Sequence, residues 1–144
     1  MPINVKPITI GEVKEIAHVI AQKHLEWGEP VPDFETRKPN VLESCLAVPF
    51  QSFLGKDAHR GLSQKGAMLF YLMVKNHPFQ NGNKRIALTT LLVFMIKNNK
   101  RVVADNTEIY NLARWVAESN PKLREETVAA IKKFIETYIK NYNF

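Results

Sequence analysis

Residues 86–96, with the sequence IALTTLLVFMI, most limit how this chain can fold. Thr89 and Thr90 are the only polar residues in this stretch, so a helix through it is apolar on nearly every side. A helix of that kind must be surrounded by other helices, because no face of it suits water. The sequence therefore predicts a buried central helix from Asn83 to about Asn98.

Helical signals flank this segment on both sides. Thr9 is a candidate cap for a helix with Val13, Ile16, Ala17 and Ile20 at core spacing. Ser63 is a candidate cap for another helix, and the last helix carries an apolar stripe from Val128 to Tyr142. The expected helices besides the central one are residues 9 to about 26, a short helix after Pro39 with Leu42, Cys45 and Leu46 inside, residues 63 to about 76, a helix after Asp105, Asn106 and Thr107, and a helix opened by Pro121.

Residues 48–55 (VPFQSFLG) differ from the rest of the chain because apolar and polar residues alternate there. The stretch is too short for a helix and ends at Gly55, which indicates an exposed β-hairpin or extended flap. The expected fold class is therefore all-α: a bundle of about six helices around a buried central helix, with a small β-hairpin flap. Residues 1–144 contain no linker or repeat, so we expect a single domain.

Positive charge is concentrated in one part of the chain. The net charge is +6, yet residues 58–104 contain eight lysines and arginines and no Asp or Glu. This bias predicts an anionic partner, either a nucleic acid backbone or a small polyphosphate. We expect Lys65, Lys97 and Lys100 to lie on solvated helix faces, and Lys84 and Arg85 to belong to a site.

Three further features of the sequence indicate where in the cell the protein is found. Cys45 is the only cysteine, so it has no partner for a disulfide within the chain, which suits a reducing compartment. The longest apolar run, residues 91–96, is far shorter than the roughly 18 residues of a membrane span. The first residues contain no apolar segment of the kind found in signal peptides. We therefore expect a soluble, cytoplasmic protein without a membrane partner.

Residues 77–85 (HPFQNGNKR) lead into the start of the central helix. The first N–H groups of a helix lack intrahelical acceptors and the macrodipole is positive there, which makes this end an anion site. Gly82 allows close approach of a phosphate, Asn83 can cap or donate, and Lys84 and Arg85 add positive charge. His77, at the entrance of the loop, is a candidate acceptor for a hydroxyl proton near neutral pH.

The same stretch resembles the signature of the Fic/Doc family, and specifically of its death-on-curing (Doc) branch. That signature reads His-x-Phe-x-(Asp/Asn)-(Ala/Gly)-Asn-Lys-Arg, and every specified position matches residues 77–85. Residues 39–49 (PNVLESCLAVP) look like the helix that leads into the family's flap, and Pro49, Phe50 and Gln51 look like the start of that flap. The resemblance covers residues 40 to about 98.

The resemblance implies transfer of a group from ATP to a protein hydroxyl, with His77 as the general base. The N–H groups from Gly82 to Lys84, together with Asn83, would hold phosphate, and Arg85 would pair with phosphate charge. Phe79 would anchor the loop in the core. The flap residues that would bind the target are Phe50, Gln51 and Ser52.

Lys84 and Asn81 bear on the kind of transfer. Family members that transfer AMP carry Gly at the position of Lys84, whereas the Doc branch is thought to hold ATP in the reversed sense and to transfer the γ-phosphoryl group. The resemblance therefore favours kinase chemistry. Many members place Asp or Glu at the position of Asn81 to bind Mg²⁺, and Asn offers only a neutral carbonyl oxygen. Mg²⁺ keeps several waters and takes phosphate ligands, so Asn81 remains a candidate, weak ligand.

The leading functional prediction is a Doc-like toxin of a toxin–antitoxin system that phosphorylates a Ser or Thr of a translation factor, such as an elongation factor. The chain lacks the family's inhibitory pattern (Ser/Thr)-x-x-x-Glu-(Gly/Asn), so the resemblance implies restraint by a separate antitoxin protein. One alternative is AMP transfer to a protein hydroxyl. Another is a catalytically idle regulatory domain that binds protein or nucleic acid, against which His77 and the intact Asn83, Lys84 and Arg85 argue.

Overall fold

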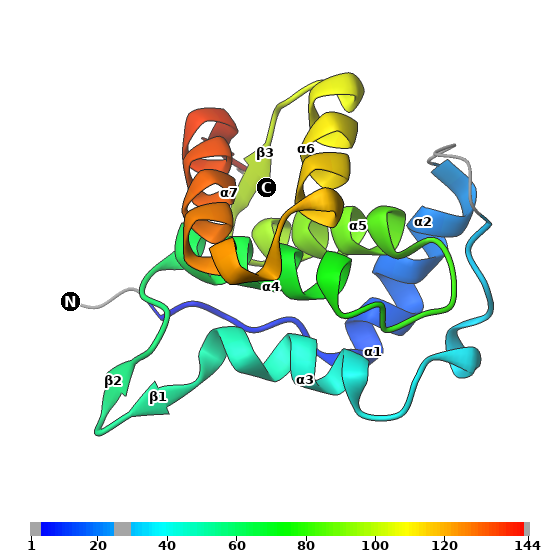
Figure 1. Cartoon of the computed structure of the whole chain (residues 1–144), viewed down its shortest axis with the longest axis horizontal. Helices are drawn as coiled ribbons and strands as arrows, with labels where there is room; N and C mark the ends of the chain where they lie inside the picture. Colours follow the sequence, from blue (N-terminus) through cyan, green and yellow to red (C-terminus); the bar gives the residue numbers. More distant parts are fainter. Residues whose placement is uncertain (1–3, 25–29, 143–144) are drawn as a thin grey trace.

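The computed structural model describes residues 4–24 and 30–142, and most of these residues are helical. The strands form two small antiparallel pairs, β1 with β2 and β3 with β4. The prediction of an all-α fold with a small β flap is therefore confirmed (Figure 1). The helices are α1 (Ile10–Glu12) and α2 (His18–His24), joined by a π-helical turn (Val13–Ala17), then α3 (Val41–Ala47), α4 (Leu62–Lys75), α5 (Asn83–Lys97), α6 (Asn106–Glu118) and α7 (Arg124–Tyr138).

The first helix begins where the sequence predicts. Thr9 Oγ1 accepts a hydrogen bond from the Glu12 N–H at 3.1 Å, and Glu12 Oε1 accepts from the Thr9 N–H at 2.8 Å, which together form a capping box. Val13 and Ala17 are buried as expected, but Ile16 is 45% exposed, because the π-helical turn shifts the helical register. The end expected near residue 26 lies outside the described residues.

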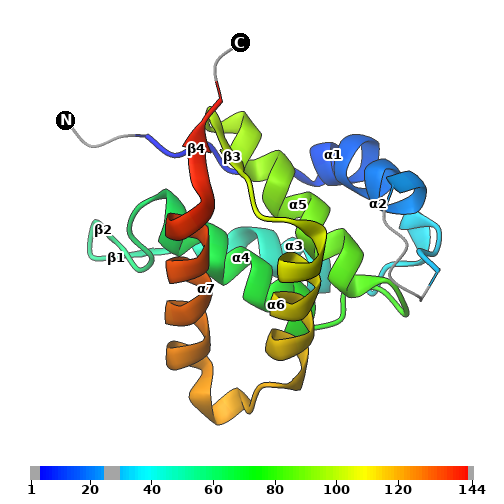
Figure 2. The ribbon, with the colours of Figure 1, turned by 90° about the horizontal axis from the view of Figure 1, so that it is seen from above.

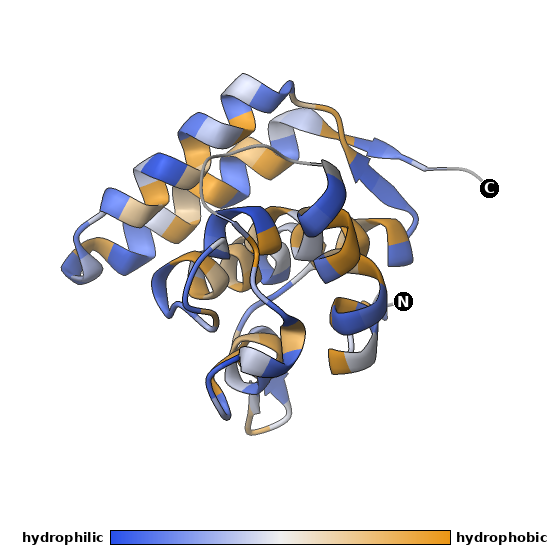
Figure 3. Cartoon of the chain, turned by 90° about the vertical axis from the view of Figure 1, so that its right-hand side faces the viewer, coloured by the Kyte–Doolittle hydropathy of each residue, from blue (hydrophilic) through white to orange (hydrophobic). Residues whose placement is uncertain are grey.

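Helices α4 and α5 pack against each other and form the core. Helix α5 is buried at nearly every position from Asn83 to Leu91, which confirms the predicted central helix. Helix α4 is equally central, since residues 65–74 are all buried and the helix also packs on α7. It begins at Leu62 after Gly61, so the expected cap at Ser63 is wrong: Ser63 lies inside the first turn. Hydrophobic residues gather where the helices face one another (Figure 3).

Helices α6 and α7 lie side by side against this core (Figure 2). The expected cap of α6 is confirmed, because the Asp105 side chain accepts from the Glu108 N–H at 2.8 Å. A 3₁₀ turn at Pro121–Leu123 leads into α7. The expected helical stripe up to Tyr142 is wrong beyond Tyr138, since the chain there forms β4 (Ile139–Asn141), which pairs with β3 (Lys100–Val102).

The flap is a hairpin of β1 (Ser52–Phe53) and β2 (Lys56–Asp57) that projects from one end of the molecule (Figure 1). Leu54 and Gly55, with φ of 53° and 76°, form the two-residue turn, and positive φ at both positions is typical of a type I′ turn. Val48–Phe50 is a 3₁₀ turn rather than part of the strand. The Phe50 ring meets the Phe94 ring of α5 edge-on at 5.8 Å, so Phe50 packs inward.

The described helices include none that is both long enough and apolar enough to cross a membrane.

Candidate active site

His77 occupies a strained backbone position directly after α4. The helix ends at Lys75 with Asn76 as its C-cap, and His77 has φ of 48°, in the left-handed region that glycine normally occupies after a helix. A non-glycine residue in this region costs on the order of 1–3 kcal/mol and is often found at functional sites. The side chain is exposed, so the surrounding structure holds His77 in a position from which its imidazole is accessible.

The loop after His77 is anchored at Phe79, whose side chain is fully buried. The expected anchoring role of Phe79 is therefore confirmed. Asn83 reinforces it, because its Oδ1 accepts from the Phe79 N–H at 3.0 Å and its Nδ2 donates to the Phe79 carbonyl at 2.8 Å. Asn83 was expected to contact phosphate, but in this structure its amide holds the loop. Its buried side chain still borders the pocket described below.

Gly82 precedes α5 and has φ of 74°. A side chain here would be strained, and a Cβ atom would lie 3.1 Å from the Pro30 carbonyl oxygen and 3.2 Å from Val31 Cα. The lack of a side chain therefore lets residues 30–31 pack on the loop. This contact is a structural reason for glycine that was not anticipated from the sequence, where Gly82 was expected to allow a phosphate to approach.

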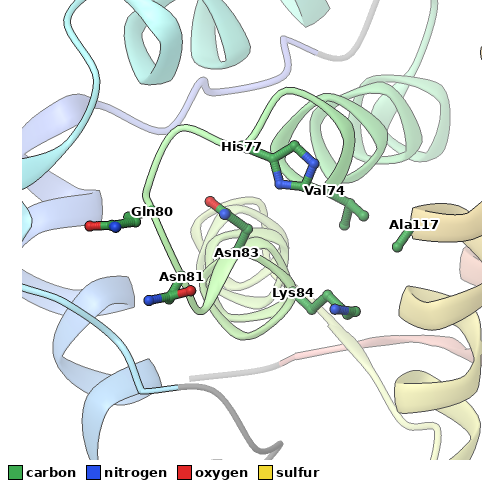
Figure 4. Close-up of a pocket in the computed structure, with 7 residues that line it drawn as sticks. All are labelled: Val74, His77, Gln80, Asn81, Asn83, Lys84 and Ala117. Atoms are coloured by element: carbon green, nitrogen blue, oxygen red, sulfur yellow. The ribbon is translucent and has the colours of Figure 1, made fainter.

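A pocket of about 150 Å³ lies at the N-terminus of α5. Figure 4 shows the His77 ring on one side of it and the Lys84 side chain on the other, with Val74 and Ala117 between them. The structure thus brings together four predicted site residues: His77, Asn81, Asn83 and Lys84. The remaining lining residues are Val74, Gln80 and Ala117.

The Lys84 side chain is half-buried at this pocket. Within residues 4–24 and 30–142, its ammonium group makes no hydrogen bond or ion pair. Because a cation in the first turn of a helix opposes the macrodipole, this position is unfavourable for the helix alone. The uncompensated charge is what a site for an anionic ligand would contain.

Arg85 is directed elsewhere. Its side chain is buried, and its guanidinium donates to the Ala21 carbonyl in α2 at 2.6 Å. Arg85 does not line the pocket, so this structure does not bring it together with His77 and Lys84. Its expected contact with phosphate stays a prediction, while its observed contact joins α5 to the first helix.

Most other charges of the basic segment are also used inside the fold. The expectation of solvated side chains is wrong for Lys65, which is only 4% exposed, and Lys97 forms an ion pair with Glu12 at 2.7 Å. Lys75 donates to the Ala117 and Ser119 carbonyls at 3.3 and 2.6 Å, and Lys100 donates to Asn141. These contacts explain much of the charge bias without a nucleic acid partner.

Three residues that line the pocket were not predicted from the sequence, for different reasons. Gln80 stands at an unspecified position within the motif, and Val74 lies one helical turn before His77. Because both are close to His77 in the sequence, they could have been predicted to lie near it. Ala117 belongs to α6, and no sequence signal connects it with the motif. The flap residues Gln51 and Ser52 are exposed and do not line this pocket.

Asn81 is exposed at the pocket and offers one neutral oxygen to a metal ion. The described part of the chain contains no group of three or more His, Cys, Asp or Glu side chains placed to hold a metal ion. This donor set fits only a Mg²⁺ ion that takes its other ligands from nucleotide phosphates and water.

His18 packs against the loop at Phe79, and its protonation should make the stability of the fold depend on pH. It is 2% exposed, its Nε2 is 2.7 Å from the Pro32 carbonyl, and its ring lies 5.2 Å from that of Phe79. Within the described residues, its Nδ1 has no hydrogen-bond partner. Burial holds the pKa of His18 below its ordinary value, although Pro32 and Asp33 raise it.

We expect acidification to destabilise the fold through His18. Below about pH 6.5 the unfolded chain binds a proton at this residue more readily than the folded chain. The free energy of unfolding therefore decreases as the pH is lowered. Protonation would also leave a buried N–H unsatisfied, at a cost of about 1–3 kcal/mol. Urea titrations at pH 7.5 and at pH 5.0 should show that the free energy of unfolding decreases less between these values for His18→Phe than for the wild type. Equal losses in both proteins would contradict this role of His18.

Comparison with known proteins agrees with this geometry. The model of the Fic/DOC family matches residues 7–95, which contain the whole motif loop and the flap. A "Toxin Doc" of Mycolicibacterium smegmatis (strain ATCC 700084 / mc(2)155) is 30% identical over 73 residues, which are 51% of this chain and 56% of that toxin. The chain thus spans little more than half the length of this curated relative. No solved structure matches significantly. Because the family match covers more than half of the chain and includes every residue of the pocket at α5 except Ala117, the chain belongs to the Fic/DOC family.

Proposed function

We propose that this protein is a Doc-like toxin that transfers the γ-phosphoryl group of ATP to a Ser or Thr hydroxyl of a target protein. One observation carries the proposal: in the pocket at the N-terminus of α5, a lysine ammonium group without a partner among the described residues lies with an accessible histidine. The histidine supplies a proton acceptor and the lysine supplies charge for phosphate. Membership of the Fic/DOC family and the similarity to a curated Doc toxin support it further.

The reaction would begin at His77. An imidazole nitrogen of His77 takes the proton of the target hydroxyl, and the hydroxyl oxygen attacks the γ-phosphorus. The bond between the γ-phosphorus and the bridging oxygen breaks, and its electron pair leaves with ADP. The product is a phosphorylated side chain, and the proton on His77 passes to solvent, to which the ring is exposed.

The phosphate groups of ATP would lie between the Lys84 side chain and the backbone of the first turn of α5. The positive end of the macrodipole favours an anion there, and Lys84 adds a full charge. The pocket of about 150 Å³ is well below the roughly 300–1,000 Å³ of a site that encloses a drug-sized ligand. It therefore suits part of the triphosphate, with the nucleoside outside it. Mg²⁺ bound with the nucleotide would neutralise phosphate charge, with Asn81 as its one candidate protein ligand.

Lys84 also decides the direction of transfer in this proposal. A lysine side chain both fills space and adds charge where an AMP-transferring site would need a small residue. The α-phosphate would then be kept from the position beside His77, and the γ-phosphate would take it. AMP transfer to the target is the alternative outcome of the test below.

The flap would align the target segment. Residues opposite each other in an antiparallel pair alternate between bonded and non-bonded positions. The Ala58 N–H donates to the Gln51 carbonyl at 2.9 Å, so the next pair, Ser52 and Asp57, is non-bonded and Ser52 directs its N–H and carbonyl away from β2. A target strand could bind along that free edge by main-chain hydrogen bonds.

We expect Ser52→Pro to lower transfer to the protein target roughly three- to tenfold, because it removes one main-chain donor worth about 0.5–1.5 kcal/mol. Proline is tolerated at an edge strand, so the flap should remain folded. Ser52→Ala keeps the donor and serves as the matched control. Steady-state kinetics with the purified target would measure the effect, and equal rates for the two variants would contradict edge docking.

We infer the partners from the resemblance and from the curated Doc toxin. The target would be a translation factor, such as an elongation factor, and a separate antitoxin would restrain the toxin. Both would be met in the cytoplasm, which the single buried Cys45 suits. Nucleic acid is not a proposed partner, because Lys65, Lys75 and Lys97 are bound within the fold.

The test is to incubate the protein with cell lysate and ATP labelled at either the α or the γ position. Label from γ-labelled ATP alone, followed by a phosphate adduct on the target in mass spectrometry, is the expected result. Label from α-labelled ATP would replace the proposal with AMP transfer. Absence of both labels, in a protein that still folds, would support the idle binding domain instead.

A further inference from the structure

Lys65 is a buried lysine that the proposed chemistry does not use. Its side chain lies on α4 and is 4% exposed as a residue. Its ammonium group donates to Asp57 in β2 at 3.1 Å and to the carbonyl of His59, two residues after that strand. Both acceptors belong to the flap or to its return, so a single core side chain binds the flap from below.

The same ammonium group connects the flap with the central helices. It lies 5.7 Å from the centre of the Phe50 ring, at the entry to the flap, and that ring packs on Phe94 of α5. Helix α5 also carries Lys84, which lines the pocket. Contacts therefore run without a break from β2 through Lys65 and Phe50 to the helix that begins at the candidate active site.

The hairpin has little else to hold it in place. Its strands contain two residues each, and all four side chains are exposed, as are those of Leu54 and Gly55 at the turn. An isolated two-stranded hairpin is marginally stable in water. The position of the flap must therefore come from its ends, where Phe50 packs on the core and Asp57 meets Lys65.

We propose that Lys65 is a positioning residue that fixes the flap relative to the pocket and thereby sets where the target hydroxyl lies. This inference rests on the proposed function, in which the flap binds the target. Lys65 itself touches neither nucleotide nor target. A flap that must be ordered when the target binds uses part of the binding free energy, so a loose flap would bind the target more weakly without any change in the phosphate site.

The main test compares Lys65→Met with Lys97→Met. Methionine keeps the length and the apolar stem of lysine and removes the charge. Lys97 is a matched control, because it also bonds to one carboxylate, Glu12 at 2.7 Å, and one carbonyl, Pro7 at 2.9 Å, and neither partner is in the flap. Lys65→Met should raise KM for the protein target about tenfold and leave KM for ATP unchanged. Lys97→Met should change neither constant.

Asp57→Asn keeps the proposal testable if Lys65→Met does not fold. Asp57 is exposed, so its substitution should leave the core intact, and Lys65 retains the His59 carbonyl. We expect a rise in KM for the target of about threefold. When both substitutions are combined, the rise should match that of Lys65→Met alone, because the two residues act as a unit. Equal losses for target and ATP, or no change in the folded variants, would overturn the positioning role.

Amide exchange separates failure of this inference from failure of the proposed function. The N–H of Ala58, which bonds to Gln51, reports on closure of the flap. It should exchange faster in Lys65→Met than in Lys97→Met, whether or not the protein transfers any group. Equal exchange rates would contradict the role of Lys65 in holding the flap. Faster exchange in a protein that transfers no group would support that role and reject only the proposed phosphotransfer.

Discussion

Substitution of His77 by alanine is expected to lower group transfer by about 10²- to 10⁴-fold, the range over which a general base contributes. His77 is the only described histidine that lines the pocket at α5, so no other described imidazole could replace it there. The loss should be in kcat, because the proton moves only in the transition state, while KM for ATP should change little. Single-turnover transfer from γ-labelled ATP measures this directly.

The backbone of His77 provides the control for folding. Asparagine tolerates the left-handed conformation and lacks a basic group, so His77→Asn should be as inactive as His77→Ala. Glycine is at ease at φ of 48°, although it costs conformational entropy, so His77→Gly should be inactive with a free energy of unfolding within about 1 kcal/mol of the wild type. Transfer at the wild-type rate in any of these variants would reject His77 as the base.

Substitution of Lys84 by glycine is expected to abolish transfer of the γ-phosphoryl group and to permit some AMP transfer. Without the lysine side chain, the pocket loses its uncompensated charge and gains space, so the α-phosphate could reach the position beside His77. AMP transfer by this variant should be slow, since Asn81 remains a weak metal ligand. Mass spectrometry of the target distinguishes a phosphate adduct from an AMP adduct.

Two further variants separate the effect of the pocket from effects on the helix and on net charge. A glycine in α5 costs about 1 kcal/mol relative to alanine, so Lys84→Ala removes the charge with less harm to the helix. Arg101→Ala lowers the net charge equally at an exposed position outside the pocket. Lys84→Ala should lose phosphotransfer and Arg101→Ala should keep it. An AMP adduct formed by the wild type would contradict the proposed direction of transfer.

Local sequence patterns predicted most of the helical fold. The central helix α5, the caps at Thr9 and Asp105 and the buried face of α3 all depend on residues within a few positions of one another. Such patterns can be recognised without knowledge of how the rest of the chain is arranged. Three local predictions failed. A π-helical turn changed the spacing at Ile16, α4 begins at Leu62 and not after a cap at Ser63, and the chain beyond Tyr138 forms β4.

The candidate site divides in the same way. Residues 77–85 indicated by themselves a loop that ends at a helix N-terminus, because glycine, proline and the buried helix are neighbours in the chain. The side chains that line the pocket do not all come from residues near the motif in the sequence. Ala117 reaches it from α6, and Arg85 is drawn away from it by a carbonyl 64 positions earlier in the sequence.

What the sequence determined by itself is therefore the identity of the motif loop, the burial of α5 and the helical class of the fold. Only the tertiary structure decided that α4 is as central as α5, that β3 pairs with β4, and that Lys65 lies beneath the flap. A lysine reads as a surface residue in any local pattern, because burial of its charge is unfavourable without partners. Its partners here are Asp57, in β2, and the His59 carbonyl, two residues after that strand. They reach Lys65 only once the chain has folded.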